Sequence, residues 1–499
     1  MLGQFSIRHS KFRHVYGQPY RRDLCYDSIH VAKNAFDSSY CAVNGKFIAV
    51  ILSSGGGGSF LVLQKEKTGR VGIKCPRVVG HRGPVLDIAW NPFNENIIAS
   101  CSEDHSIRIW FIPDDGIPLK IKKQDDEEER VEELDEPVII LNGHSRRVNM
   151  VVWHPTANNV LASSSYDLSV VIWNVAQGSI LNRIDCHKLP IFCIAFNNDG
   201  SLLASTSKDK KLRVIDPKTS EVKNEGICHF GLKGARVIFA GKFNKIITTG
   251  FSKHSERQFA VWDPDNLKEP IKLEGIDSGT GILFPFYDQD RNILYLAGKG
   301  DGNIRFYELF DQKPYCYFLN QFKSPSPHQG LTCLPNRYLD VPKCEIFRFY
   351  KLHSQGYLEP VSMIAPRKYD SIQTDLYPLT NAGIPSMEAM EWFEGASKPP
   401  VLKSITEDAI AEYRSRAKSI TKMASAVNKN NALLEEEAKK RGLENMTKEQ
   451  VGFISNTATF CLNLLYLIIA YKLLQQELEN VKKELALKNQ EIKKLKEKS

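Results

Sequence analysis

The sequence lacks the paired cysteines on which a structural metal site or a disulfide framework would depend. Its eleven cysteines are scattered, none forms a Cys-x-x-Cys pair, and Cys186 and Cys193 have no second pair near them. A common structural zinc site needs two close pairs of cysteines or histidines. We therefore expect free, mostly buried thiols in a reducing compartment, and no metal site.

Motifs for phosphate binding and for secretion are also missing. Gly55–Gly58 is not followed by the lysine and helix of a phosphate-binding loop, so we expect a turn between two strands. The basic N-terminal stretch has no apolar core, which argues against a signal peptide. A net charge of +8 is modest for 499 residues and does not demand nucleic acid as a partner. We expect a cytoplasmic protein without a cofactor.

Two segments of the chain are clearly similar to each other. Gly80–Trp110 and Gly143–Trp173 both begin with Gly-His, pass through a turn that contains proline, and end in tryptophan. In each segment an aspartate follows a serine by four residues and the tryptophan follows that aspartate by six. This pattern is typical of WD repeats, which form the four-stranded blades of a β-propeller.

Each clear repeat has one histidine, one serine, one aspartate and one tryptophan that can form a hydrogen-bonded chain within its blade. A serine, histidine and aspartate could also be a nucleophilic triad. The set recurs, however, and includes a tryptophan that a triad does not need, so we predict a structural role and no enzymatic activity. The predicted tetrads are His81, Ser100, Asp104 and Trp110, and His144, Ser163, Asp167 and Trp173.

Weaker copies of the repeat bring the predicted number of blades to seven. The fold class is therefore all-β, a seven-bladed WD-repeat β-propeller, and its N-terminal strand should close the ring by pairing with the last blade. The weaker copies are marked by Lys46–Gln64, by His187, Ser205, Asp209 and Ile215, by Trp262, by Phe306 and Tyr307, and by Phe349 and Tyr350.

From Phe460 onward, apolar residues recur in a heptad pattern that predicts an α-helical coiled coil. A lone helix would leave this apolar stripe in water, so we expect a homo-oligomer. Lys488 is the one charged residue on the seam. The apolar seam consists of Leu464, Leu467, Tyr471, Leu474, Leu478, Val481, Leu485, Ile492 and Leu495.

Residues 451–471 carry no charge, so a membrane span is an alternative for this stretch. Its densely apolar part, Phe460–Tyr471, would rise about 18 Å as a helix, whereas the hydrocarbon core of a membrane is about 30 Å thick. The stripe also continues in phase into the charged coil. Membrane contact is possible but not favoured.

Several segments lie outside the repeat consensus and match a known family in order. They are RHSKFRHVYGQ, CYDSIHV, GGGGSFLVL, GFSKHSERQFAVWDP, AGKGDGNIRFYE, KCEIFRFYKL and PRKYDSIQTDLYP. Through them the chain resembles the coronin family over roughly residues 5–395. The resemblance implies binding to actin filaments at the actin-rich cortex, regulation of the branching complex built on actin-related proteins, and self-association through the coil.

The resemblance also bears on domain organisation and oligomer number. We expect a propeller at residues 1–352, a C-terminal extension at 353–395 that packs against it, a linker at 396–456 and the coiled coil at 457–497. Coronin coils are often trimers with a charged motif. Glu491 and Lys496 reverse the charges of that motif, so a trimer is favoured and a dimer stays open.

Basic residues crowd the N-terminal region and could hold the acidic surface of actin. The alternative is a solvated strand edge that charges protect from aggregation. Coronins commonly have an arginine where this chain has His30, and a mostly neutral imidazole lacks the guanidinium fork, so we expect weak actin binding. The proposed contact residues are Arg8, Lys11, Arg13, Arg21, Arg22 and His30.

The acidic run 125–136 is predicted to be a solvated loop, with an autoinhibitory arm over the basic residues as the alternative. For the whole protein we expect an actin-binding scaffold. The alternative is a membrane- or vesicle-associated WD-repeat scaffold that binds actin weakly. His30 and the apolar stretch 451–471 favour this alternative.

Overall fold

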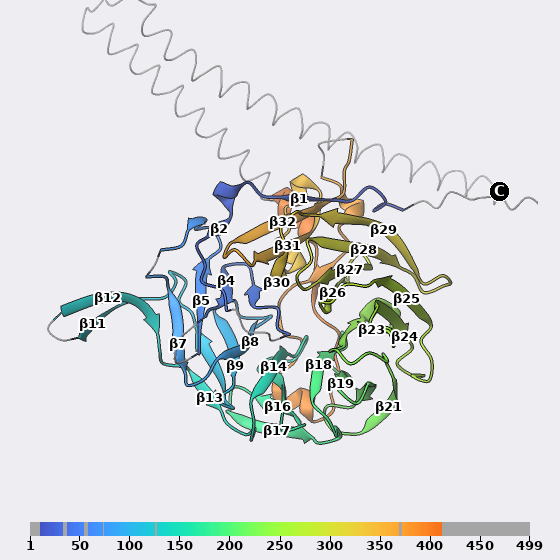
Figure 1. Ribbon diagram of the computed structural model, residues 1–499, viewed down its shortest axis with the longest axis horizontal. Helices are drawn as coiled ribbons and strands as arrows, with labels where there is room; N and C mark the ends of the chain where they lie inside the picture. Colours follow the sequence, from blue (N-terminus) through green and yellow to red (C-terminus); the bar gives the residue numbers. More distant parts are fainter. Residues whose placement is uncertain are drawn as a thin grey trace, which may run out of the picture. The chain divides into compact units, whose positions relative to one another are not determined.

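The computed structural model describes residues 10–32, 37–53, 58–72, 74–124, 127–368 and 372–411. Seven larger β-sheets are arranged as the blades of a propeller (Figure 1), which confirms the predicted fold class. Within the described residues no helix is long and apolar enough to span a membrane. The predicted coiled-coil seam, the stretch 451–471 and Arg8 lie outside the described residues.

Each blade is an antiparallel meander. Its successive strands lie farther and farther from the ring axis. The first blade consists of β3 (Cys41–Val43), β4 (Phe47–Ile51), β5 (Gly58–Gln64) and β7 (Arg77–His81). The second consists of β8 (Val85–Trp90), β9 (Ile97–Ser102), β10 (Ile107–Phe111) and β13 (Ile139–Leu141). The third consists of β14 (Val148–Trp153), β15 (Val160–Ser165), β16 (Val170–Asn174) and β17 (Ser179–Ile184).

The other four blades continue this order around the ring. They consist of β18 (Ile191–Phe196), β19 (Leu203–Ser207), β20 (Lys211–Ile215) and β21 (Val222–Ile227); β22 (Arg236–Ala240), β23 (Lys245–Phe251), β24 (Arg257–Trp262) and β25 (Lys272–Asp277); β26 (Leu283–Asp288), β27 (Ile293–Gly298), β28 (Asn303–Leu309) and β29 (Cys316–Lys323); and β30 (His328–Cys333), β31 (Glu345–His353), β32 (Leu358–Ile364) and β1 (Tyr16–Pro19).

The hydrophobic core lies between neighbouring blades rather than in one central mass. Middle strands are buried on both faces, so they are continuous apolar runs instead of alternating ones. In one such layer, Leu86 and Ile107 of the second blade pack with Trp153 and Trp173 of the third. Because each blade completes the core of the next, a single blade would expose its apolar faces to water.

The N-terminal strand closes the ring. β1 runs antiparallel to β32, with Tyr16 opposite Ile364 and Pro19 opposite Val361. The last blade thus takes its outer strand from the start of the chain, as predicted. This pairing joins the first and last strands of the propeller and leaves no open gap between them.

The last blade extends beyond the predicted domain boundary at residue 352. β31 ends at His353, and its hairpin partner β32 is the strand on which β1 pairs. β32 lacks the aromatic ending that marks the other repeats, so the sequence pattern did not reveal it. Residues 341–344, 367–375 and 404–411 belong to a second compact unit, which includes the 3-10 helix η4 (Val341–Lys343).

Most of the acidic run 125–136, predicted as a loop, is instead a strand of a β-hairpin, since its residues 127–134 form β12. β11 (Leu119–Gln124) pairs with β12 (Glu127–Leu134), which runs parallel to β7 of the first blade. Figure 1 shows the hairpin projecting from the ring. The register places Lys122 opposite Glu129 and Lys123 opposite Glu128. At its base, the buried Glu133 carboxylate accepts a 2.7 Å hydrogen bond from Arg77 Nε.

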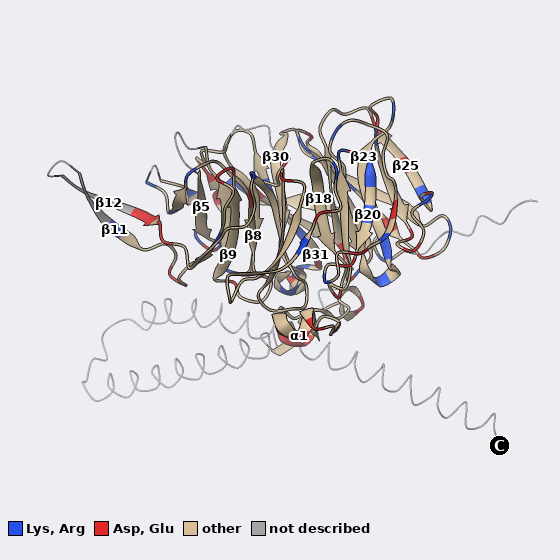
Figure 2. Cartoon of the chain, turned by 90° about the horizontal axis from the view of Figure 1, so that it is seen from below, with Lys and Arg blue, Asp and Glu red and all other residues tan. Residues whose placement is uncertain are grey.

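The segment after the last blade contacts the propeller through a short helix, α1 (Ala389–Phe393), which Figure 2 shows at one face of the ring. Trp392 is fully buried, and its ring lies 4.7 Å from that of His154 and donates to the carbonyl of Gly200 at 3.3 Å. A side chain at position 200 would collide with His154. The short strands β33 (Thr380–Asn381) and β34 (Leu402–Lys403) pair on either side of α1 in the chain.

A buried arginine fixes the same segment beside the sixth blade. Arg291 donates to the backbone carbonyl of Leu376 at 2.8 Å and to Asp288 at 3.0 Å. Its guanidinium also lies 5.1 Å from the ring centroid of Tyr377. Arg291 and Asp288 are both buried, so the pair compensates charges that would otherwise be costly away from water.

Candidate functional site

The N-terminal basic residues lie along the outer edge of the ring. A turn at residues 11–14 is held by the buried side chains of Phe12 and Val15, which leaves Lys11 and Arg13 exposed. Ser10 anchors this turn by donating to Glu308 of the sixth blade at 2.7 Å. Lys11 and Arg13 therefore lie beside the sixth blade, before β1 begins.

β1 separates these two residues from the other predicted contacts. After β1 the chain forms the 3-10 helix η1 (Arg22–Leu24) and β2 (Tyr26–Asp27), which pairs with β32. Arg21 and Arg22 are 80% and 58% exposed. The predicted basic patch is thus two clusters, one at each end of β1, rather than one.

Both arginines of the second cluster have acidic neighbours. Arg21 pairs with Asp23 at 3.1 Å and Arg22 with Asp27 at 2.7 Å. The hydrogen bond from Arg22 lowers the pKa of Asp27, and the same bond raises the pKa of Arg22. Exposed pairs of this kind contribute little to stability. Either guanidinium can therefore exchange its partner for a carboxylate on another protein.

The position of Arg22 is fixed by the turn between β31 and β32. Its guanidinium lies 4.0 Å from the ring centroid of Tyr357, which stacks on His353 at 3.9 Å. Gly356 in this turn has φ +82°, and an added Cβ would lie 2.4 Å from the carbonyl oxygen of Ile29. The turn can therefore approach residues 28–30 only because residue 356 is glycine.

His30 lies at the junction of the last and first blades. The residue before it, Ile29, donates its N–H to Gly356 at 2.7 Å, and the carbonyl of His30 accepts from Ser53 at 3.1 Å. The backbone is thus held from both blades, while the imidazole is exposed. Arg22 and His30 consequently share one anchor, the 353–357 turn.

The structure adds Arg70 to this cluster, a residue that the sequence analysis did not select. β2 runs parallel to β6 (Gly69–Arg70), and the register places exposed Arg70 opposite Asp27. Arg70 also contributes to the lowered pKa of Asp27, after the hydrogen bonds from Arg22 and Ser28. This pairing brings positions 27 and 70 together. Each of the two strands has only two residues, so the sequence pattern does not predict them. We call Arg21, Arg22, His30 and Arg70 the junction cluster.

The predicted tetrads have the hydrogen-bond geometry of a nucleophilic triad but are closed to substrate. Trp110 Nε1 donates to Ser100 Oγ at 2.8 Å, Ser100 meets His81 Nε2 at 2.8 Å, and His81 Nδ1 meets Asp104 at 2.9 Å. Burial lowers the pKa of His81. Ser100 is fully buried and already accepts from tryptophan, so its hydroxyl cannot reach a substrate in this conformation.

The second tetrad repeats this geometry at nearly the same distances. His144 meets Asp167 at 2.9 Å and Ser163 at 2.8 Å, and Trp173 donates to Ser163 at 2.8 Å. In the fourth blade His187 keeps the contact with Ser205 at 2.8 Å, but Asp209 pairs with Arg213 instead. Ile215 fills the buried position of the tryptophan.

The fifth blade contains a tetrad that the sequence analysis missed. His229 meets Thr248 at 2.9 Å and Gln258 at 2.9 Å, and Trp262 donates to Thr248 at 2.7 Å. Threonine and glutamine replace the serine and aspartate of the pattern, which hid the set. Among the described residues no group of three or more His, Cys, Asp or Glu side chains could hold a metal ion.

Comparison with protein families recovers the repeats and the N-terminal region. Residues 73–110, 135–174 and 178–216 match the WD domain, G-beta repeat, and residues 358–400 match a type of WD40 repeat. Residues 5–70, which contain the junction cluster, match a domain of unknown function (DUF1899).

The chain is similar to curated coronins and to a solved coronin structure. It is 45% identical to Coronin-2A of Homo sapiens over 80% of this chain and 74% of that protein. It is 49% identical to Coronin-2B of Xenopus tropicalis over 83% of this chain and 82% of that protein. The WD40 domain of Toxoplasma gondii coronin aligns with a TM-score of 0.72 and 30% identity, over 79% of this chain and 97% of that one.

Proposed function

Because the chain belongs to the coronin family, we propose that it is a non-catalytic scaffold that binds actin filaments through the junction cluster. The observation that carries this proposal is the rigid, exposed placement of Arg21, Arg22, His30 and Arg70 where the last blade meets the first. Lys11 and Arg13 form a second, smaller contact at the other end of β1.

The junction cluster suits an acidic partner for electrostatic reasons. Its charged groups are exposed, so they attract a complementary surface at a distance and speed association. The backbone at His30 is held by two blades and that of Arg70 by its pairing with β2, so binding orders few additional residues. Acidic side chains of a filament would compete with Asp23 and Asp27 for the two arginines. Affinity per contact should therefore be modest.

His30 is the weakest contact that we propose. An imidazole lacks the planar fork of a guanidinium and cannot form its two parallel hydrogen bonds. A charge-assisted hydrogen bond contributes about 1.5–3 kcal/mol. We infer that this chain binds filaments more weakly than a coronin with arginine at this position, with Arg70 compensating in part.

The finer parts of the proposal rest on the sequence. We propose that the heptad seam from Leu464 to Leu495 makes the protein a homo-oligomer, a trimer rather than a dimer, and that it couples filaments to the branching complex built on actin-related proteins. A cytoplasmic location at the actin-rich cortex follows from these partners. Several filament contacts held in one oligomer would raise the apparent affinity through avidity.

The test is co-sedimentation of the full-length protein with actin filaments. Arg22→Ala and Arg70→Ala should each weaken binding several-fold, whereas Arg146→Ala, at an exposed position on the third blade's side of the ring, should leave it unchanged. Equal binding by all three variants would remove the junction cluster from the contact. If the wild-type protein does not pellet at physiological salt, the alternative of a membrane- or vesicle-associated scaffold replaces this proposal, and flotation with liposomes would test it.

A further inference from the structure

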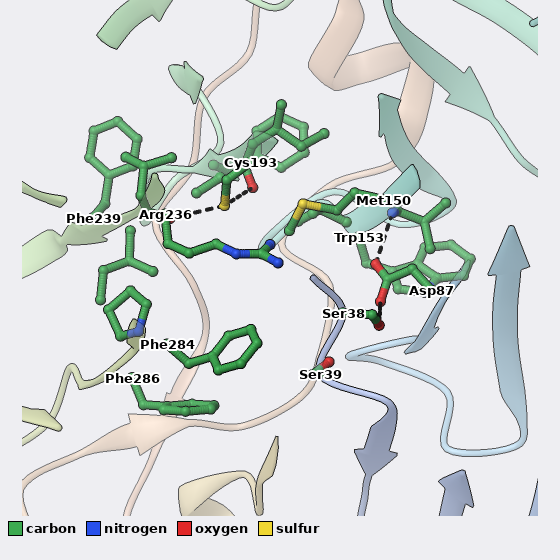
Figure 3. Close-up of a pocket in the computed structure, with 18 of the residues that line it drawn as sticks. Ser38, Ser39, Asp87, Met150, Trp153, Cys193, Arg236, Phe239, Phe284 and Phe286 are labelled. Carbon is green, nitrogen blue, oxygen red and sulfur yellow. Dashed lines mark hydrogen bonds between the residues drawn. The ribbon is translucent and has the colours of Figure 1, made fainter. Parts of the chain in front are cut away.

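The propeller contains a cavity of about 470 Å³ around the ring axis. Its wall comes from the innermost strands β8, β14, β18, β22 and β26 and from the segment before β3 (Figure 3). This volume lies within the range of small-molecule sites. The cavity is separate from the junction cluster, which lies on the outer edge of the ring.

One guanidinium points into this cavity without a protein partner. Arg236, the first residue of β22, extends between Met150 and Phe284 (Figure 3), and its guanidinium lies 5.2 Å from the ring centroid of Phe284. Within the described residues no hydrogen bond or ion pair to its side chain is found. A half-buried guanidinium of this kind leaves its N–H donors directed at whatever occupies the cavity.

The nearby carboxylate of Asp87 is held by the wall instead. Its two oxygens accept hydrogen bonds from the backbone N–H of Val151 at 3.2 Å and from the Ser38 hydroxyl at 3.3 Å. Burial raises the pKa of Asp87 to about 6, and Arg236 offsets this only in part. Among the described residues no ion pair joins Asp87 to Arg236, so the N–H donors of Arg236 remain available for an anion from outside the chain.

The rest of the cavity is largely apolar. Phe284 and Phe286 of β26 form one side, and Met150 and Cys193 face them across the cavity (Figure 3). Phe286 is fixed by an edge-to-face contact with Phe349 at 5.5 Å. An apolar wall with one unpaired guanidinium selects for a ligand that has one anionic group and an apolar body.

We propose that this cavity binds a small organic carboxylate. Its carboxylate accepts two parallel hydrogen bonds from Arg236, and its apolar body packs against Phe284 and Met150. Arginine suits a planar carboxylate because its fork matches the two oxygens. Inorganic phosphate could pair with the same fork but has no apolar body, and an acidic side chain of a partner protein is a different ligand.

The experiment is calorimetric titration of the full-length protein with phenylacetate, its neutral counterpart phenylacetamide, and inorganic phosphate. Phenylacetate should bind, and phenylacetamide and phosphate should bind about tenfold more weakly or worse. Arg236→Met should weaken phenylacetate binding by about tenfold or more, because it keeps the length of the side chain and removes the charge. Arg146→Met, on the exterior, is the matched control and should bind as the wild type does.

Arg236→Lys keeps the charge but loses the fork, so its affinity should fall between those of the wild type and Arg236→Met. If Arg236→Met does not fold, this variant and the phenylacetamide comparison carry the test. The proposal is overturned if phenylacetate shows no binding, if it binds Arg236→Met as well as the wild type, or if phosphate binds equally tightly. Binding of an acidic peptide where free phenylacetate fails would overturn it as well.

Discussion

His30 shows how one residue can be structurally fixed and chemically weak at once. Its backbone is tied to Ser53 on one side and, through Ile29, to Gly356 on the other. The imidazole is exposed, so a larger side chain can replace it without disturbing the core. The residue therefore affects binding without affecting the fold.

We predict that His30→Arg strengthens actin binding by about tenfold, which corresponds to one added charge-assisted contact of about 1.5 kcal/mol. Co-sedimentation with filaments measures the change. His254→Arg is the matched control, because His254 is exposed but lies between β23 and β24 of the fifth blade, outside both proposed contacts. An equal gain from both variants would attribute the effect to net charge and contradict a specific role for position 30.

His154 illustrates the opposite case, a titratable residue that is entirely structural. It is fully buried between Phe196 and Trp392, and burial lowers its pKa from 6.5 to about 4. The folded protein thus keeps His154 neutral where the unfolded chain binds a proton. Stability is present above the unfolded pKa and is lost as pH falls from about 6.5 to 4, by roughly 3 kcal/mol.

We predict that the free energy of unfolding decreases steeply over this pH range, and that His154→Gln reduces the slope. Burial lowers the pKa of His187 and His229 to about 4 as well, so the variant should remove only part of the slope. Urea unfolding at several pH values measures it. An unchanged slope in the variant would show that His154 does not titrate in this range.

At the scale of elements, β1 and the β11–β12 hairpin are strands that are hard to recognise in the sequence, because β1 is short and the hairpin is highly charged. β1 has only four residues, and most of them are exposed, yet it supplies the outer strand of the last blade. Most residues of the hairpin strands are charged, so the alternation of inward and outward side chains along each strand is hard to see in the sequence. Its strands form because β12 is added to the edge of β7.

We predict that Gly17→Ala destabilises the protein by about 1–3 kcal/mol, because a Cβ at this position in β1 would lie 2.5 Å from the buried ring of Phe322. The ring must shift or the closing strand must move away. Gly275→Ala is the control in another outer strand, where an added Cβ meets nothing within 4 Å, and its effect should stay within about 0.5 kcal/mol. Thermal unfolding compares them, and similar losses would contradict the steric explanation.

At the scale of the whole molecule, closure of the ring determines where the candidate site lies. The junction cluster combines Arg21, Arg22 and His30 from the first 30 residues with Arg70 of β6, a strand that pairs with β2, and with the turn at 353–357. These segments meet only because the first strand pairs with the last blade. Unfolding of either end should therefore remove the site together with the closure.

We predict that filament binding by the full-length protein weakens markedly between about 50 and 200 mM salt, because exposed charges are screened over about a Debye length. Co-sedimentation across a salt series measures it. Arg22→Ala should show a shallower dependence than the wild type, whereas Arg146→Ala should not. A salt-independent interaction would point to an apolar contact outside the junction cluster.

The tetrads, the seven blades and the ring closure could all be predicted from the sequence, since each rests on residues at fixed spacing. Gln258 and Thr248 were missed because they replace the expected residue types with others that make the same hydrogen bonds. The hairpin was mistaken for a loop because its charges suggested solvation. The structure divides the predicted basic residues into two groups, one at each end of β1, a division that sequence proximity does not show.

The repeat pattern by itself determined the propeller and the buried tetrads, because burial and hydrogen bonding within a blade act between residues that are close in the chain. Tertiary structure alone decided that Arg70 lies beside Asp27, the partner of Arg22, and that Arg236 faces the cavity without a hydrogen bond or ion pair from the described residues. These facts depend on contacts between segments far apart in sequence, and such contacts exist only after the ring has closed. The spacing of residues within a repeat determines the fold of each blade, whereas the junction cluster and the cavity form where different blades meet.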